Sequence, residues 1–325
     1  MSIIYGSYYE GPALLSRGYF EMTSTYPFIC KICGRESNET ILDCDKDDFC
    51  ICMNGHGCEI ERRNANIFKE IYKRLIENGK DCFPRGLRTK EIENFSYIFP
   101  PYVRFANFED RKLKLNYIKK EFLWYLKGDK FDVSITQYAK VWKDFINIDG
   151  SINSNYGQYI FGENNQFDKV VDCLSKDKDS RRAVIMILQP YHLLNLDMKE
   201  VPCTYCLSFR IRNNKLNMSV KMRSQDAWFG FGSDIPCFSF IHEMIYVVLK
   251  NKYNDLEYGD YFHSVDSFHV YERHFDMIKK ISAGVSNYSF VSCPQISSLN
   301  EVVFLRKGDF SNIPFSFKFS EWLVN

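Results

Sequence analysis

The chain of 325 residues has no excess of charge of either sign and no long apolar run. Its 42 basic and 41 acidic residues give a formal net charge of +1, so no global attraction to nucleic acid or to an anionic membrane is expected. No stretch approaches the roughly 18–20 consecutive apolar residues of a membrane-spanning helix. Residues 1–9 also lack the basic and apolar regions of a secretion signal. We therefore expect a cytoplasmic protein without a membrane partner.

The composition is that of a folded protein. Apolar residues make up 45% of the chain and aromatic residues 16%, which is ample for a packed core. The 12 cysteines are expected to be thiols or metal ligands, because a cytoplasmic chain rarely forms disulfides. Residues 1–60 are rich in Cys, Gly, Asp and Asn without a sustained period, whereas residues 61–325 read as one domain with one core.

The N-terminal cysteines indicate a zinc-binding module. Cys30-Lys-Ile-Cys33-Gly34 resembles a zinc knuckle, in which two thiolates stand two residues apart before a glycine. The second half of a tetrahedral site would come from a subset of the remaining ligands, which are Cys50, Cys52, His56 and Cys58. The spacing Cys50-x-Cys52 is unusual for a second knuckle, so the ligand set stays open. The alternative is a group of reduced, unligated thiols.

Periodicity predicts a mixture of helices and strands. Helical spacing begins at Asn64 and is expected to end at Gly79 in a left-handed conformation. A second helix is predicted over 113–126, ended by Gly128, and a buried helix over 238–249. Residues 203–222 alternate between apolar and polar side chains on both sides of a turn at 213–215, as in a β-hairpin. The predicted fold class is α+β.

Five short segments carry residues suited to nucleotide chemistry. They are Ser151-Ile-Asn-Ser-Asn-Tyr-Gly157, Asp179-Ser-Arg-Arg182, Pro202-Cys203, Met222-Arg-Ser-Gln-Asp-Ala-Trp-Phe-Gly230 followed by Asp234, and His269-Val-Tyr271. Each alone is weak, but in this order and spacing they resemble the thymidylate synthase superfamily from about Asn64 to the C-terminus. The resemblance implies a mixed β-sheet packed with helices and transfer of a one-carbon unit to C5 of a pyrimidine nucleotide.

Cys203 is the expected nucleophile. C5 of a pyrimidine is a poor nucleophile until a group adds to C6, and a thiolate is soft and reactive enough to do so. Arg223 would lie near both the thiol and the nucleotide phosphate and favour the thiolate. A cysteine that begins a strand is more often a small buried hydrophobe. Because Arg223-Ser224 follow in the order found in the family, the nucleophile is the favoured interpretation.

The resemblance assigns further residues to the phosphate and the dimer. Arg223 and Ser224 would bind the phosphate from one subunit, while Arg181 and Arg182 would reach across from the partner of a homodimer. Arginine suits this task because its fork of donors binds phosphate bidentately. Arg85 would be a further clamp, although Arg88 could align in its place. For each arginine the alternative is a solvated surface charge.

Other residues take family roles by the same resemblance. Glu121 opens the apolar stretch Glu-Phe-Leu-Trp-Tyr-Leu, where an idle carboxylate would be costly, and matches a glutamate that manages protons through water. The remaining assignments are Tyr156 in the proton network, Trp142 and Asp226 at the folate, Gly230 at the nucleotide, and His269 and Tyr271 at the sugar 3′-hydroxyl. Tyr156 and Trp142 could instead belong to the core, and a His-x-Tyr pair is more often structural.

Asp234 predicts which base is bound. Thymidylate synthases have an asparagine here, whose amide offers a donor and an acceptor to the N3–H and O4 of uracil. An ionised carboxylate only accepts, so it would repel O4, whereas it can accept from the 4-amino group of cytosine and stabilise a protonated N3. A mismatched buried polar edge costs on the order of 1–3 kcal/mol. Cytosine is therefore the expected base.

The same substitution is found in the deoxycytidylate hydroxymethylases of tailed phages, which act in the host cytoplasm. Further similarity lies in Phe229-Gly-Phe231, in His269-Val-Tyr-x-Arg-His-Phe275 and in Thr204, where methylating enzymes generally carry histidine. The chain ends at Asn325, without the longer tail that shields the intermediate from water in thymidylate synthases. We therefore expect a 5-hydroxymethylase that uses 5,10-methylenetetrahydrofolate and either dCMP or CMP.

Two other functions stay open at this stage. One is a methylase of dUMP or dCMP, since the two reactions diverge only after the one-carbon unit has been transferred. The other is a non-catalytic nucleic-acid-binding protein that uses the cysteine module. The joint presence of Cys203, Glu121, Arg223 and Asp226 argues against the second.

Overall fold

A computed structural model describes residues 28–29, 36–37, 58–195 and 198–325, with side chains from Asn64 onward. Five of the predicted zinc ligands, Cys30, Cys33, Cys50, Cys52 and His56, lie outside these residues, as does the side chain of Cys58. Structural zinc therefore stays a prediction, and so does the boundary between residues 60 and 61.

Helices and strands are interspersed along the described part of the chain. The strands are β1 (Phe28–Ile29), β2 (Glu36–Ser37), β3 (Lys80–Cys82), β4 (Thr89–Phe99), β5 (Val184–Met186), β6 (Thr204–Arg212), β7 (Lys215–Asp226) and β8 (Glu257–Tyr271). The α-helices are α1 (Cys58–Asn78), α2 (Leu115–Lys127), α3 (Tyr156–Ile160), α4 (Gln166–Lys176), α5 (Pro190–Leu194), α6 (Gly230–Lys250), α7 (Phe275–Ser282), α8 (Leu299–Lys307) and α9 (Lys318–Val324). Short 3-10 helices are η1 (Pro84–Gly86), η2 (Ser134–Gln137), η3 (Lys140–Phe145) and η4 (Glu272–His274).

A mixed six-stranded sheet organises the domain. Its strand order is β3-β4-β8-β7-β6-β5, and β7 pairs with β8 in parallel while the other neighbours are antiparallel. The predicted hairpin is β6–β7, and its turn places Asn213 and Asn214 at positive φ, which asparagine tolerates better than most residues. The α+β prediction is confirmed.

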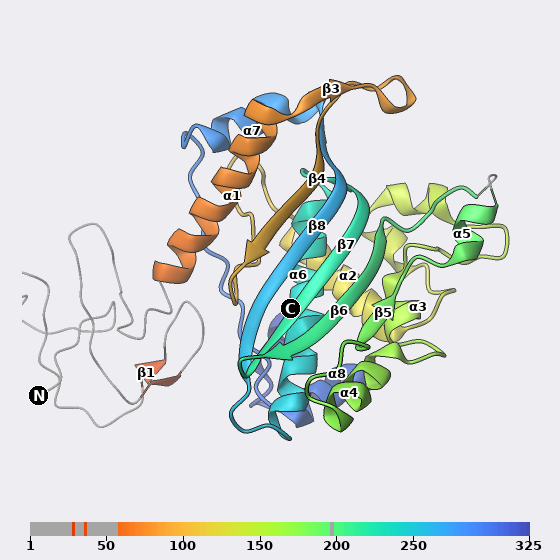
Figure 1. Cartoon of the computed structure of the whole chain (residues 1–325), viewed down its shortest axis with the longest axis vertical. Helices are drawn as coiled ribbons and strands as arrows, with labels where there is room; N and C mark the ends of the chain where they lie inside the picture. Colours follow the sequence, from red (N-terminus) through yellow and green to blue (C-terminus); the bar gives the residue numbers. More distant parts are fainter. Residues whose placement is uncertain (1–27, 30–35, 38–57, 196–197) are drawn as a thin grey trace, which may run out of the picture.

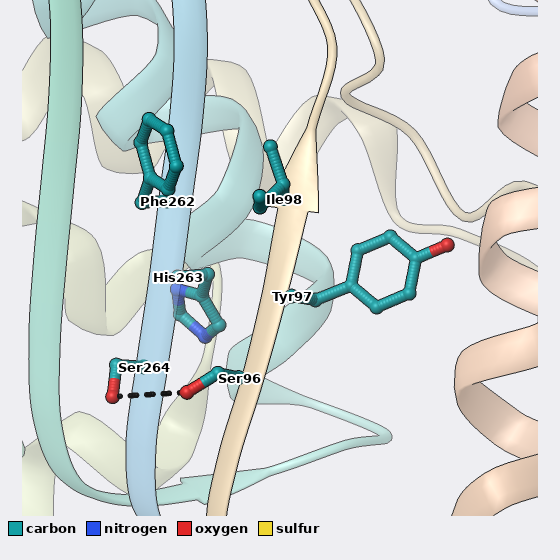
Figure 2. Close-up of a pocket in the computed structure, with 6 residues that line it drawn as sticks. All are labelled: Ser96, Tyr97, Ile98, Phe262, His263 and Ser264. Carbon is teal, nitrogen blue, oxygen red and sulfur yellow. Dashed lines mark hydrogen bonds between the residues drawn. The ribbon is translucent and has the colours of Figure 1, made fainter.

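Helices cover one face of this sheet. In Figure 1, α6 and α2 lie behind β4, β8, β7 and β6, and no helix in the described part of the chain lies in front of them. The front face carries a shallow pocket along β4 and β8 (Figure 2), where Ile98 is paired with Phe262 and Ser96 with Ser264. Ile98 is 50% exposed. No described helix is both long and apolar enough to cross a bilayer.

Two helix ends differ from the prediction. α1 ends before Gly79 as expected, but Gly79 is not left-handed; glycine is needed because a Cβ there would lie 2.3 Å from the Leu75 carbonyl oxygen. α6 begins at Gly230, eight residues before the predicted start at Phe238. Two glycines and Pro236 hide its first turns, since both residue types normally interrupt helices. Gly128 ends α2 as predicted, and its backbone is left-handed.

Candidate active site

Cys203 stands at the entry to β6, where backbone hydrogen bonds hold it. The Arg223 amide donates to the Cys203 carbonyl at 2.8 Å. The Arg223 guanidinium donates to the carbonyls of Pro202 through Nε at 3.1 Å and of Val201 through Nη2 at 2.7 Å. Arg223 therefore fixes the segment that carries the thiol, in addition to placing a positive charge beside it.

The Cys203 thiol lies near one basic and two acidic side chains, but burial has the largest effect on its pKa. Burial raises its pKa to about 11; Arg223 opposes this shift, while the carboxyl groups of Asp234 and Glu200 reinforce it. The thiol is therefore protonated at neutral pH in a single protomer. A larger population of thiolate needs more positive charge than Arg223 alone provides.

Tyr156 lies beside the thiol at the start of α3. Burial raises its phenol pKa well above the usual value, Cys203 and Asp234 add to the shift, and the Thr204 side chain opposes it. Its ring stacks on Phe238, with 5.9 Å between the ring centroids. Gly157 permits this position, because a Cβ there would lie 2.1 Å from the Tyr125 carbonyl oxygen on α2.

Asp234 projects from the first turns of α6 into the same region. Its Oδ2 accepts a hydrogen bond from Gln225 Nε2 at 2.9 Å. Burial and repulsion from Glu121, opposed by the Gln225 hydrogen bond, together raise the Asp234 pKa to about 8. A substantial fraction of Asp234 is therefore protonated at neutral pH, so that it can supply a proton as well as accept hydrogen bonds.

Glu121 is a second buried acid, on α2. Burial raises its pKa to about 7, and the hydroxyls of Ser233, Tyr117 and Tyr125 oppose the shift. Tyr117 donates to Glu121 Oε1 at 2.9 Å, and Trp142 Nε1 donates to the Tyr117 hydroxyl at 2.9 Å. Glu121 Oε2 is buried without a hydrogen-bond partner in the described residues, which is the surrounding expected of an acid that binds water or substrate.

We expect Glu121→Gln to remove part of the pH dependence of stability. The raised pKa means that the native protein holds this proton more tightly than the unfolded chain, so stability is lost as the pH rises through 7. From pH 5 to pH 8 this loss amounts to about 2–3 kcal/mol in the free energy of unfolding. Urea unfolding should show a loss smaller by that amount in Glu121→Gln than in wild type. Equal losses would contradict the assignment of this proton to Glu121.

The predicted arginines lie in three places. Arg223 is at the thiol, whereas Arg181 and Arg182 are exposed just before the edge strand β5. In the loop before β4, Arg88 forms ion pairs with Asp81 and Glu272, both at 2.8 Å. No ion pair of Arg85 occurs among the described residues, and its backbone is left-handed with φ 51°. Of the two alternatives, Arg85 is thus the one available to bind an anion.

The end of β7 brings together the remaining predicted residues. Asp226 pairs with His269 of β8 and Ser224 with Ser267. The Asp226 carboxyl is shifted to a higher pKa by burial, opposed by the Trp228 amide that donates to Oδ1 at 2.8 Å and by the charges of His269 and Arg273. Tyr271 is the last residue of β8, and its ring packs edge-on against His269. Gly230 is the first residue of α6.

Sequence reasoning gave no role to three groups at this site. Glu200 accepts hydrogen bonds from the Ser154 amide at 2.9 Å and from the Ser154 hydroxyl, which ties the 151–157 motif to the nucleophile segment. Gln225 binds Asp234, and Tyr117 binds Glu121. Tyr117 could have been found, since residues four apart share a helix face. The contacts of Glu200 with Ser154 and of Gln225 with Asp234 join different segments, and the sequence does not indicate that these segments meet.

Comparisons with known proteins find similar sequences and a similar fold. A sequence profile described as thymidylate synthase matches residues 66–296, more than two thirds of the chain. The deoxyuridylate hydroxymethyltransferase of Bacillus phage SP01 is 31% identical over 222 residues, 64% of this chain and 57% of that relative. The deoxycytidylate 5-hydroxymethyltransferase of Enterobacteria phage T4 is 30% identical over 201 residues, 59% of this chain and 80% of that relative. Thermostable thymidylate synthase A from Bacillus subtilis shares the fold with a TM-score of 0.55 at 22% identity, covering 67% of this chain and 83% of that one.

Proposed function

This chain belongs to the thymidylate synthase family, and on that premise we propose that it is a one-carbon transferase that converts dCMP or CMP to the 5-hydroxymethyl nucleotide. The two named relatives act on different bases and have nearly equal identity to this chain, so similarity alone does not choose between cytosine and uracil. The choice rests on Asp234, the buried acid that acts most strongly on the Cys203 thiol.

Asp234 is the observation that carries the proposal. Its carboxyl group acts electrostatically on Cys203 and is itself affected by Glu121, so it is close to both the nucleophile and the second buried acid. Addition of the thiol to C6 of cytosine places negative charge on the ring, which protonation at N3 neutralises. An acid with a pKa of about 8 is well matched to that proton transfer near neutral pH.

The side chains around Cys203 support the covalent step that we propose. Cys203 adds to C6, and Arg223 stabilises the thiolate before the bond forms and holds the backbone of Val201 and Pro202 in place. Once C6 carries the thiol, C5 becomes a nucleophile. Tyr156, buried beside Cys203, is positioned to exchange a proton near C5.

Two predicted residues fit a folate. The Asp226 carboxyl accepts from the backbone amides of Trp228 and Phe229, and these neutral donors leave lone pairs that can accept from the N–H edge of a pterin. Trp142 is half-buried and oriented by its bond to the Tyr117 hydroxyl. Asp226 and Trp142 would hold 5,10-methylenetetrahydrofolate, which supplies the one-carbon unit when bound.

Glu121 supports the choice of a hydroxymethyl product. A hydroxymethylase completes its product with water, and the free Oε2 of Glu121 is a buried acceptor for such a molecule. Its pKa of about 7 allows it to take a proton from water and to return one during the cycle. Cys203 is released when the hydroxymethyl group is complete.

A homodimer would complete the phosphate site. A phosphate dianion near Cys203 needs several donors, yet Arg223 already uses Nε and Nη2 to bind backbone carbonyls. Arg181 and Arg182 are exposed beside the sheet. The sheet face left uncovered by the described helices carries Ile98 and Phe262 (Figure 2) and is the surface we propose for the dimer. Arginines from a partner would also lower the pKa of the thiol.

Subunit mixing tests the shared site. Cys203→Ala and Arg181→Ala/Arg182→Ala are each expected to be inactive, but mixing them with subunit exchange should restore about one quarter of wild-type activity, because half of the dimers are mixed and each has one intact site. The matched control pairs Cys203→Ala with Arg223→Ala, which belong to the same half-site, and should restore none. Recovery in neither mixture would contradict donation across the dimer.

A product assay tests the function itself. The protein is incubated with 5,10-methylenetetrahydrofolate and separately with CMP, dCMP, UMP and dUMP, and the nucleotides are identified by mass. We expect a 5-hydroxymethyl product from one or both cytidylates. Turnover of dUMP alone would overturn the role of Asp234, and formation of dihydrofolate with a methylated nucleotide would show a methylase.

A further inference from the structure

A buried chain of hydrogen bonds stands behind Asp234. Gln225 Nε2 donates to Asp234 Oδ2 at 2.9 Å, and Gln225 Oε1 contacts His263 Nε2 at 2.7 Å. His263 Nδ1 in turn contacts the Tyr261 hydroxyl at 2.9 Å. These residues come from α6, β7 and β8, and none of the four is more than 9% exposed. We call Tyr261, His263 and Gln225 the relay.

Because Gln225 donates to Asp234, the direction of every other hydrogen bond in the relay follows from its chemistry. Burial lowers the pKa of His263 to about 3, so the ring is neutral and carries one N–H. The amide oxygen of Gln225 can only accept, which places that proton on Nε2 and leaves Nδ1 to accept from the Tyr261 hydroxyl. The donors therefore all point from Tyr261 towards Asp234.

A donor at Oδ2 favours placing the proton of Asp234 on its other oxygen. Glycine at position 230 leaves room for this arrangement, because a Cβ there would lie only 3.3 Å from Asp234 Oδ2. With Oδ2 held as an acceptor, neutral Asp234 presents O–H at Oδ1 and a lone pair at Oδ2. A protonated Oδ2 would be a weaker acceptor for the Gln225 amide, so placing the proton there would weaken this buried hydrogen bond unless the whole relay reversed as well.

We propose that the relay makes Asp234 selective for one pyrimidine by fixing which of its two oxygens carries the proton. A carboxylic acid free to place its proton on either oxygen matches both bases: O–H to N3 with C=O to the amino group suits cytosine, and the opposite placement suits O4 and N3–H of uracil. With its donors directed towards Asp234, the relay favours the first of these placements. This inference rests on the proposed function, and under it Oδ1 faces N3 and Oδ2 faces the 4-amino group.

Gln225, His263 and Tyr261 are positioning residues in this account, because they act through Asp234. Gln225→Met removes the donor at nearly constant volume, and Tyr261→Phe removes only the hydroxyl that sets the polarity of the relay. Tyr253→Phe is the matched control, since its hydroxyl binds the carbonyls of Leu174 and Ser175 rather than a member of the relay. The readout is the ratio of kcat/KM for dCMP to kcat/KM for dUMP, measured with methylenetetrahydrofolate.

We expect the ratio to move towards unity by at least about tenfold in Gln225→Met and by a smaller factor in Tyr261→Phe, with no change in Tyr253→Phe. Equal losses on both nucleotides in both relay variants, with the ratio unchanged, would reduce the relay to a structural role and overturn the proposal. If Gln225→Met does not fold, the ratio of kcat/KM values in Tyr261→Phe tests the proposal alone.

A failure of the proposed function would give different results from a failure of the relay proposal. If wild type prefers dUMP and the relay variants lose that preference, the base assignment is wrong and the relay is supported. If wild type turns over neither nucleotide, the hydroxymethylase assignment fails, and the ratio of the dissociation constants of dCMP and dUMP, measured by calorimetry, tests the relay in the same variants.

Discussion

Cys203→Ala is expected to lower turnover by at least about four orders of magnitude, because C5 of a pyrimidine is a poor nucleophile unless a group adds to C6. Binding of the nucleotide should change much less. Arg223 and Ser224 remain, and the backbone that Arg223 holds is bound through carbonyl oxygens rather than through the thiol. The expected signature is therefore a collapse of kcat with a dissociation constant for dCMP within a few-fold of wild type.

Cys206→Ala is the matched control for this loss. Cys206 is a half-buried thiol three residues along β6, and burial raises its pKa, with Lys221 opposing the shift. It should retain turnover. Activity is measured by mass detection of the product, and the adduct by intact-protein mass after rapid denaturation with nucleotide and folate. Substantial turnover by Cys203→Ala, or an adduct on that variant, would rule out the covalent mechanism.

The pH dependence of the wild-type reaction should reflect the same electrostatics. The thiol pKa of about 11 in a single protomer means that reactivity towards an alkylating agent should rise steadily above neutral pH. Arginines from a partner subunit would move that rise to lower pH, so the oligomeric state and the reactivity of Cys203 are linked.

Local patterns predicted the fold well where each residue has a local cause. Gly128 ends α2 because glycine accepts a left-handed backbone, and Asn213-Asn214 turns the β6–β7 hairpin for a related reason. Gly79 shows the limit of such reasoning. Its place after a helix is visible in the sequence, but its cause is a contact with the Leu75 carbonyl, which only the folded chain reveals.

The candidate site divides in the same way. Cys203, Arg223 and Asp234 stand in recognisable motifs, and the structure brings all three to one region. Gln225 stands in the same motif, yet its role depends on His263, which is 38 residues away in sequence. The parallel pairing of β7 and β8 makes that contact. Parallel strands need a long crossover, here through α6, so no local spacing indicates it.

Asp234→Asn is expected to reverse the base preference. An amide can donate to N3 of cytosine but cannot give up a proton there, so the adduct with cytosine loses its neutralising step. We expect kcat/KM for dCMP to fall by roughly a thousandfold. Uracil needs an acceptor at N3–H and a donor at O4, and an asparagine offers both. The dUMP reaction should therefore exceed the dCMP reaction in this variant.

In Asp234→Asn the hydrogen bonds of the relay must also reverse. To face uracil, the new amide must place its NH₂ where Oδ2 of Asp234 now accepts from Gln225, so Gln225 must turn its oxygen towards position 234 and its NH₂ towards His263. His263 then carries its proton on Nδ1 and donates to the Tyr261 oxygen, which a phenol can accept. Steady-state kinetics of Asp234→Asn on dCMP and dUMP, alone and combined with Tyr261→Phe, test both steps. A dCMP preference that survives in Asp234→Asn would show that residue 234 does not read the base, whereas a switch that Tyr261→Phe weakens would show that the relay must reverse for uracil to bind.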